Sequence, residues 1–351
     1  MWTAVSLMVL SACMAGLFVL HCSSVETGLV PSPPSLTGKD IPGYSRPEDD
    51  SFLEWAEWYI VWSYQEKANW QQTRLPSGFP YFGAIAQYWS GYCSSWRVVR
   101  GKYPFNFGDH LMLAVIGSSF TVEYGLKGLY EKTTGRVSEW ISGGGMTDED
   151  RYAASVAADY GAFVANRPFY EFSFASTLRG LWGRTSFFGP HLLRKFERKG
   201  WLSLDYGIEA IYCGLITLAS HAVYGVEDDV TWVLTGNGGP DSLADIPDFT
   251  IVRAPEPDAV IVRMPRYQKF TDVATRVLGR GIRFREIAGN RQIVVSAVVP
   301  AEWSGDLKAG EVLFWSPILT NAALKRVAIR VSVFELQSVA AALPIEHIYD
   351  Y

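Results

Sequence analysis

One stretch of the sequence occurs twice and determines the expected fold of the middle of the chain: FTVEYGLKGLY at residues 120–130 returns as LSLDYGIEAIY at residues 202–212. Every aligned pair is identical or chemically similar except Lys127, which stands against Glu209. The motifs FGDHL at residues 107–111 and FGPHL at residues 188–192 precede the two copies at nearly equal distances. Two motifs in the same order at matching spacing indicate an internal duplication.

Each copy lies in a long helical pattern. The patterns begin beside Asp109 and Pro190, residue types that suit the start of a helix. We therefore expect helices over residues 109–133 and 191–224. The capping sequence Thr147-Asp-Glu-Asp150 predicts another helix that runs to about Asn166, before Arg167-Pro168.

The two long helices are expected to cross a membrane, although their apolar stretches are shorter than the roughly 20 residues of a typical span. Arg194, Lys195, Arg198 and Lys199 precede the second apolar stretch, and Glu227-Asp-Asp229 follows it. The excess of positive charge on the cytoplasmic side of membrane helices places residue 194 in the cytoplasm and the C-terminus outside. The alternative is a membrane-associated helical region behind a single anchor.

The N-terminal sequence predicts a membrane attachment. Residues 1–22 contain the uncharged run VSLMVLSACMAGLFVL at residues 5–20, which is typical of a signal anchor or a signal peptide. Cys22 is a candidate for lipidation, and an unmodified apolar cysteine is the alternative. Residues 23–50 are rich in Pro, Ser and Gly and are expected to form a tether. The expected location is a cell membrane of the bacterial inner-membrane type.

Residues 51–225 form the expected helical, duplicated region, and they begin with an unusual density of aromatic side chains. This density is compatible with an interfacial segment on a membrane or with a tryptophan-rich core, and the sequence favours neither. The tryptophans concerned are Trp55, Trp58, Trp62, Trp70, Trp89 and Trp96.

Residues 226–351 have the pattern of a separate α+β domain. Short β-branched runs predict strands at 231–234, 259–263, 283–287, 292–299, 311–315 and 326–333. A helix is expected at 267–278, another near 335–342, and a hairpin at Gly289-Asn290. The β-α-β-β order suggests a ferredoxin-like domain, placed outside the cytoplasm. The fold class of the whole chain is therefore expected to be α+β.

The duplication places two histidines and two acids at equivalent positions: His110 with His191, and Glu123 with Asp205. If the copies converge, these groups suit a divalent metal or a proton relay inside a membrane. The alternative is structural, with Glu123 paired to Lys127 one helical turn away and the histidines at helix starts.

Both copies contain the pair Tyr-Gly at the same position, which suggests where the repeats pack against each other. Small residues let two helices approach closely, so Tyr124, Gly125, Tyr206 and Gly207 are the expected contact positions.

A basic stretch at residues 276–285 contains Arg280, Arg283 and Arg285, which are candidates for binding an anionic ligand; a solvated helix end is the alternative. The formal net charge of −5 gives no general attraction to nucleic acid, so none is expected as a partner. The sequence carries none of the common nucleophile, phosphate-loop or zinc-protease motifs, and it identifies no cofactor.

These observations favour a membrane-anchored interaction or assembly protein of the cell envelope, with the membrane and a protein as partners. The alternative is a membrane-embedded enzyme that acts on a lipid or a quinone with a histidine and carboxylate site between the two repeats.

Overall fold

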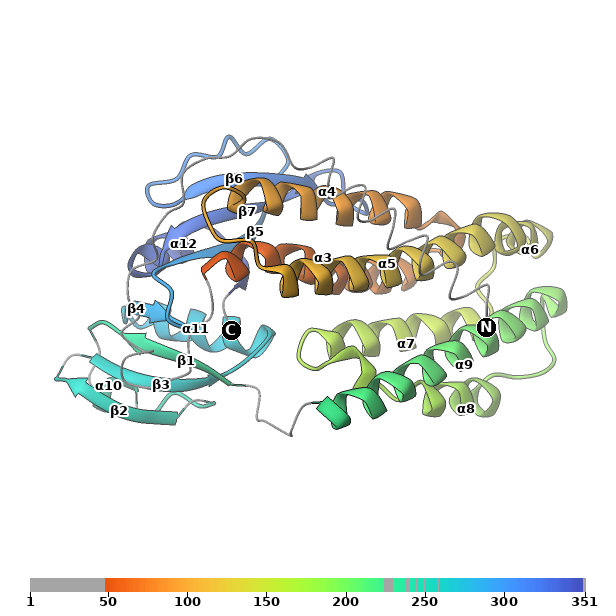
Figure 1. Ribbon diagram of the computed structural model, residues 1–351. Coiled ribbons are helices and arrows are strands. Elements are labelled where there is room, and N and C mark those ends of the chain that lie inside the picture. Colours follow the sequence, from red (N-terminus) through yellow and green to blue (C-terminus); the bar gives the residue numbers. More distant parts are fainter. Residues whose placement is uncertain are drawn as a thin grey trace. The chain divides into compact units, whose positions relative to one another are not determined.

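The computed structural model describes residues 48–223, 230–237, 240–243, 245–248, 250–257 and 259–349. The expected anchor, Cys22 and nearly all of the tether lie outside these residues. The chain is α+β, as expected, with helices in its first part and strands in its last part (Figure 1).

The contacts divide the chain into two compact units. The first unit contains residues 48–58, Gln87–Ser119 and the described residues from 230 to 349. The second contains Tyr59–Ala86 and residues 120–223. Three helices contribute to both units: α3 (Glu48–Gln71), α4 (Tyr81–Val99) and α5 (Phe107–Tyr130).

The element order repeats along the helical part of the chain. Helix α3, the 3₁₀ turn η1 (Pro76–Gly78), α4 and α5 are followed by α7 (Asp148–Val164), the 3₁₀ turn η3 (Phe169–Glu171), α8 (Phe174–Arg184) and α9 (Leu192–Val223). Between the two sets lie the π-helical turn η2 (Glu131–Gly135) and α6 (Arg136–Ile141). The same order of helix, 3₁₀ turn, helix and long helix supports the duplication.

The expected helices are present at nearly the expected bounds. Helix α7 begins with a complete capping box, in which Thr147 Oγ1 accepts a hydrogen bond from the Asp150 amide and the Asp150 carboxylate accepts one from the Thr147 amide. Within the described part of the chain, no helix combines the length and the apolar character that crossing a bilayer requires.

The strands of the first unit form two four-stranded antiparallel sheets. One has the order β2-β3-β1-β4 and the other β6-β7-β5-β8. Their bounds are β1 Val230–Thr235, β2 Thr250–Glu256, β3 Ala259–Pro265, β4 Phe284–Ile287, β5 Gln292–Pro300, β6 Glu311–Pro317, β7 Leu324–Ser332 and β8 Ile345–Ile348. The helices of this part are α10 (Pro240–Leu243), α11 (Gln268–Gly279) and α12 (Leu336–Ala342), with the 3₁₀ turn η4 (Val333–Glu335) before α12.

This arrangement differs from the single sheet of a ferredoxin-like domain. All six expected strands form, but β2 and β8 complete the sheets and were not expected from the sequence. Both lie at sheet edges, where strand patterns are weak: β2 contains Pro255 and pairs with an interrupted register, and β8 has only four residues. The expected hairpin is present, because Ile287 and Asn290 exchange backbone hydrogen bonds across Ala288 and Gly289 at positive φ.

The start of α3 packs in the core of the first unit. Ser51 Oγ accepts a hydrogen bond of 2.9 Å from the Val294 amide in β5. The Trp58 ring stacks on His347 with 3.4 Å between ring centroids, and Trp55 meets Phe314 edge to face. Of the two readings of the aromatic segment, the structure places these tryptophans in a core.

Candidate functional site

A small cavity of about 60 Å³ lies within the second unit. Helices α3, α4, α5, α7 and α9 all contribute to its wall. The wall contains an unusual number of charged side chains, among them Lys67, Glu123, Lys127, Arg198, Asp205 and Glu209. The volume is sufficient for a few water molecules or a very small polar ligand.

Lys127 is the centre of the charges around this cavity. Its Nζ lies 2.8 Å from Glu123 Oε1, 3.1 Å from Asp205 Oδ1 and 3.3 Å from Glu209 Oε1. The repeat aligns Glu123 with Asp205 and Lys127 with Glu209. All four members of the two aligned pairs therefore meet at one point, and the only dissimilar pair of the repeat supplies an ion pair between the copies.

The environment shifts the pKa values of these groups in different directions. Burial acts to raise the pKa of Glu123, but Lys127, Lys67 and a 2.5 Å hydrogen bond from Tyr64 Oη hold it below its usual value. Burial raises the pKa of Glu209 to about 7, because Lys127 must be shared with two other carboxylates. Burial lowers the pKa of Lys127 less than the three carboxylates raise it, so this lysine stays charged.

Lys67 differs from Lys127, although both line the cavity. Within the described part of the chain, its Nζ makes no hydrogen bond and no ion pair; it lies 5.4 Å and 5.5 Å from the ring centroids of Tyr64 and Tyr124. Burial, helped by the neighbouring Lys127, lowers the pKa of Lys67 to about 8. No sequence pattern singled out Lys67, because this residue lies outside the repeated motif.

The two histidines do not join the two acids. His110 belongs to the first unit, where its Nδ1 lies 2.8 Å from Tyr92 Oη and burial lowers its pKa to about 4. His191 is exposed, has a φ of 63° and is not among the residues that line the cavity. The residues that the structure describes include no group of three or more His, Cys, Asp or Glu side chains that could hold a metal ion.

The four expected packing residues separate into two kinds. Tyr124 and Tyr206 are buried. Gly125 and Gly207 face away from the protein, since a methyl group built on either would meet no heavy atom within 4 Å. The reason is helical geometry. In each copy the acid at position 123 or 205, the tyrosine after it and the residue at position 127 or 209 face inward, so the glycine at position 125 or 207 faces outward.

The arginines proposed for an anionic ligand have partners within the protein. Arg280 pairs with Asp245, and Arg285 lies 2.7 Å from Glu256. Arg283 Nε donates a hydrogen bond of 3.2 Å to Gln337 Oε1.

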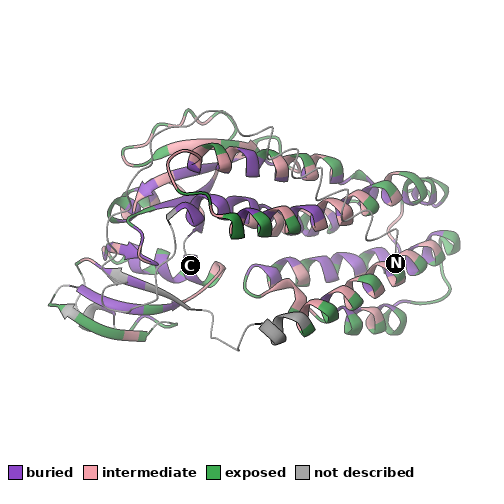
Figure 2. Cartoon of the chain, in the orientation of Figure 1, coloured by how far each residue is buried: buried purple, intermediate pink, exposed green. Residues whose placement is uncertain are grey.

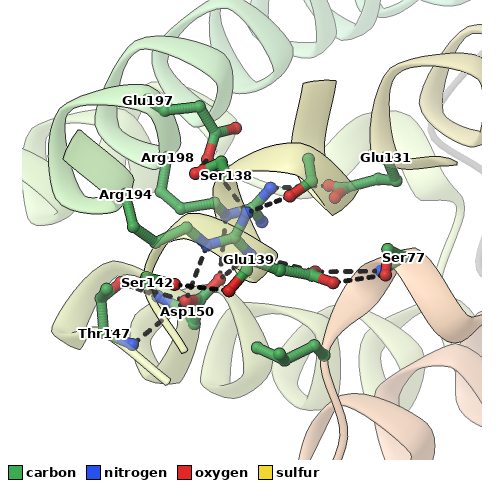
Figure 3. Close-up of polar contacts among 12 residues, drawn as sticks. Ser77, Glu131, Ser138, Glu139, Ser142, Thr147, Asp150, Arg194, Glu197 and Arg198 are labelled. Carbon is green, nitrogen blue, oxygen red and sulfur yellow. Dashed lines mark hydrogen bonds and ion pairs between the residues drawn. The ribbon is translucent and has the colours of Figure 1, made fainter. Parts of the chain in front are cut away.

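The four basic side chains within residues 194–199 are buried. Two of them, Arg194 and Arg198, form a second polar cluster (Figure 3). Arg194 pairs with Glu139 on α6, Asp150 on α7 and Glu197 on α9. Arg198 lies 3.0 Å from Asp150, and also contacts Glu131. The charges that predicted a membrane orientation therefore neutralise acids inside the unit. The acidic capping sequence Thr147-Asp-Glu-Asp150 was the available signal for this pairing.

The outward face of α9 is apolar from Leu192 to Leu218. Exposed and buried positions alternate along this helix (Figure 2). Each exposed position carries an apolar side chain or a glycine, whereas each charged residue is buried or half-buried. The exposed residues are Leu192, Leu193, Phe196, Gly200, Leu204, Ile208, Ile211, Gly214, Leu215 and Leu218. Helix α7 of the same unit shows the ordinary pattern, since Asp148, Arg151, Ser155 and Asp159 are exposed.

Comparison with known proteins identifies no relative: no family model, no curated protein and no solved structure matches this chain.

Proposed function

We propose that this chain is a membrane-anchored interaction or assembly protein, and that the outward face of α9 is its interaction surface. In this proposal the apolar N-terminal segment holds the chain at a cell membrane of the bacterial inner-membrane type. The strand-rich part lies on the extracytoplasmic side. The partner is a protein that offers an apolar helix.

The observation that carries the proposal is the inverted polarity of α9. Ile211 and Leu218 are 68% and 72% exposed, and Leu204, Ile208 and Leu215 are exposed by more than half. Burying one such side chain contributes roughly 1.5–3 kcal/mol. A contiguous exposed apolar face of this size is typical of an interaction surface.

A photo-crosslinking experiment tests the proposal in the full chain in its membrane. The crosslinking residue p-benzoylphenylalanine is placed at position 211, and at the exposed Ala158 on α7 as a matched control. The proposal expects a protein adduct from position 211 and none from position 158. Adducts to lipid alone, or no adduct from position 211, would overturn it.

The cavity supports a second candidate function, a reaction with a small polar carbonyl compound. An amine without an ion pair and with a pKa near 8 is largely available as a nucleophile in mildly alkaline solution. Lys67 Nζ would form a bond to the carbonyl carbon while Glu209 protonates the oxygen. Loss of water would then leave an imine, and Glu209 would recover its proton from the nitrogen.

This candidate differs from the enzyme that the sequence suggested. A lipid or a quinone is large and apolar, whereas a cavity of about 60 Å³ with charged walls suits a molecule of a few atoms. The candidate reactive groups are also different: they are Lys67 and the carboxylates around Lys127, in place of the two histidines.

Reductive trapping tests this second candidate. The full chain is treated with glycolaldehyde and cyanoborohydride between pH 6 and 9, and modified lysines are mapped by mass spectrometry. The candidate function expects Lys67 to react ahead of the exposed Lys269, with a half-maximal rate near pH 8. Glu209→Gln should slow the reaction at Lys67 and not at Lys269. Modification of Lys269 with none at Lys67 rules the candidate out.

A further inference from the structure

The outward face of α9 has a regular spacing of small and large residues. Gly200, Gly207 and Gly214 follow one another at intervals of seven residues. Leu204, Ile211 and Leu218 do the same, four residues further along. An apolar pattern with a period of seven, spaced alternately by four and three, is the pattern of a helix that packs along another helix.

The three glycines leave room for a close partner. A methyl group built on Gly200, Gly207 or Gly214 would meet no heavy atom within 4 Å. Glycine costs about 1 kcal/mol relative to alanine in a helix interior, so three open glycines on one face weaken the helix without any gain inside the chain. Such residues allow the backbone of a second helix to approach closely.

The spacing is complementary to itself when two copies run in opposite directions. With the twofold axis beside residue 209, Gly200 lies opposite Leu218, Leu204 opposite Gly214, and Gly207 opposite Ile211. A single register thus places all three glycines against all three large side chains. From Gly200 to Leu218, this contact extends along the helix for about 27 Å.

A parallel pair lacks this complementarity. Glycine would face glycine, and large side chains would face large side chains. The interface would then contain cavities beside the glycines and steric overlap beside the large side chains. A twofold antiparallel pair also uses the same patch on both molecules, as the common symmetric dimers do.

Charge does not oppose the pairing. The charged side chains of α9 turn away from this face, and Asp205 and Glu209 are already engaged by Lys127 inside the unit. We infer that α9 pairs antiparallel with α9 of a second copy of this chain, centred on residue 209. This inference rests on the proposed function and names its partner.

Cysteine crosslinking tests the register. Two differently tagged full-length copies are mixed in the membrane, one with Leu204→Cys and one with Gly214→Cys, and mildly oxidised. We expect a disulfide-linked heterodimer between positions 204 and 214, mapped by mass spectrometry, and no dimer linked through position 204 when Leu204→Cys is present alone. The unsubstituted chain, treated identically, controls for the native cysteines. A 204–204 link would instead show a parallel pair and overturn the inference.

A glycine substitution tests the close approach without disturbing the fold. Gly207→Leu places a large side chain in open space and improves helix propensity, so the chain should fold as before. We expect at least a tenfold loss of dimer, measured by light scattering in detergent. Gly183→Leu on α8, also an open helical position, is the matched control and should leave the dimer intact.

The two proposals fail differently. Suppose that position 211 crosslinks to another protein, but the 204–214 disulfide does not form and Gly207→Leu leaves the mass of the complex unchanged. The inference of an α9–α9 pair is then wrong, and the proposed function stands. If position 211 yields no protein adduct, both are wrong.

Discussion

At the scale of single residues, the one dissimilar pair of the repeat has a physical explanation. Two lysines at positions 127 and 209 would face two acids, and two glutamates there would leave four acids at one point. The observed pair gives Lys127 three carboxylates, and Lys67 stands nearby as a second cation. The duplicated helices are therefore related in backbone and complementary in charge.

Charge exchange between the two positions tests this explanation. Lys127→Glu leaves four acids beside Lys67 and should lower the free energy of unfolding by about 3–5 kcal/mol. Adding Glu209→Lys restores a lysine at the equivalent position and should recover at least about 2 kcal/mol. Urea denaturation measures both. Arg151→Glu, at an exposed site on α7, is the control and should change stability by about 0.5 kcal/mol or less. Strict additivity of the two changes would contradict the explanation.

The raised pKa of Glu209 predicts a dependence on pH. Its pKa is about 7 in the folded chain against 4.5 for an unperturbed glutamate, so the folded state binds more protons between these values. Stability from this group is complete below pH 4.5 and is lost as the pH rises toward 7.

Glu209→Gln removes that titration. The variant should match the unsubstituted chain near pH 4.5 and exceed its stability by on the order of 2 kcal/mol above pH 7. Urea denaturation at pH 5, 6, 7 and 8 gives the two curves. Parallel curves over this range would show that Glu209 has no raised pKa.

The sequence could predict only part of this site. The repeat drew attention to Glu123 and Asp205 because alignment reveals equivalence, and equivalent positions on two packed helices meet. The same alignment linked His110 and His191, but those residues stand at the helix starts, far along the helix from the acids. Lys67 lies outside any motif, and only the folded chain brings it to the cavity.

At the scale of elements, the start of α7 combines two tasks in one side chain. Asp150 completes the capping box with Thr147 and also neutralises Arg194 and Arg198, each at 3.0 Å. Burial acts to raise its pKa, and the two arginines hold it below its usual value. The cap is worth about 1 kcal/mol, whereas a buried charge without its partner costs several times more.

Substitutions in α7 should separate these two contributions. Thr147→Ala should cost about 1 kcal/mol of unfolding free energy, and Asp150→Asn about 3–5 kcal/mol. Asp159→Asn, exposed on the same helix, should change stability by about 0.5 kcal/mol or less. Thermal and urea denaturation provide the comparison. Equal losses from Thr147→Ala and Asp150→Asn would mean that Asp150 acts only as a cap.

Helix α9 shows that a correctly predicted helix does not reveal which of its faces is buried. Periodicity reveals that one face is apolar and the opposite face charged, and the usual inference turns the apolar face toward the core. Here Arg194 and Arg198 pair with acids on η2, α6 and α7, so the charged face is the inner one. The partners lie 44 to 67 residues away along the chain, beyond the reach of any local pattern.

At the scale of the whole molecule, composition and compactness divide the chain differently. Composition changes near residue 225, where helices give way to strands. The compact units instead join residues 48–58 and Gln87–Ser119 to the strands, so the first unit is built from three separated parts of the chain. Such contacts between distant segments leave no trace in local composition.

A chain that ends at residue 225 tests which division governs folding. It keeps every described helix up to α9 and loses the partners of the buried aromatic residues on α3: Trp58 would lose the His347 ring, and Trp55 would lose Phe314 and Tyr349. Exposing even one large core aromatic residue typically costs about 3–5 kcal/mol, which is a large fraction of the stability of a domain.

We therefore expect the truncated chain to show red-shifted tryptophan emission and a weaker near-ultraviolet circular dichroism signal than the full chain. Its unfolding should be less cooperative. Trp58→Ala in the full chain should reproduce part of this loss, since it removes the same contact without removing the sheets. If the truncated chain unfolds in one cooperative transition with unshifted emission, residues 48–58 and Gln87–Ser119 do not depend on the strands, and the composition boundary is the true folding boundary.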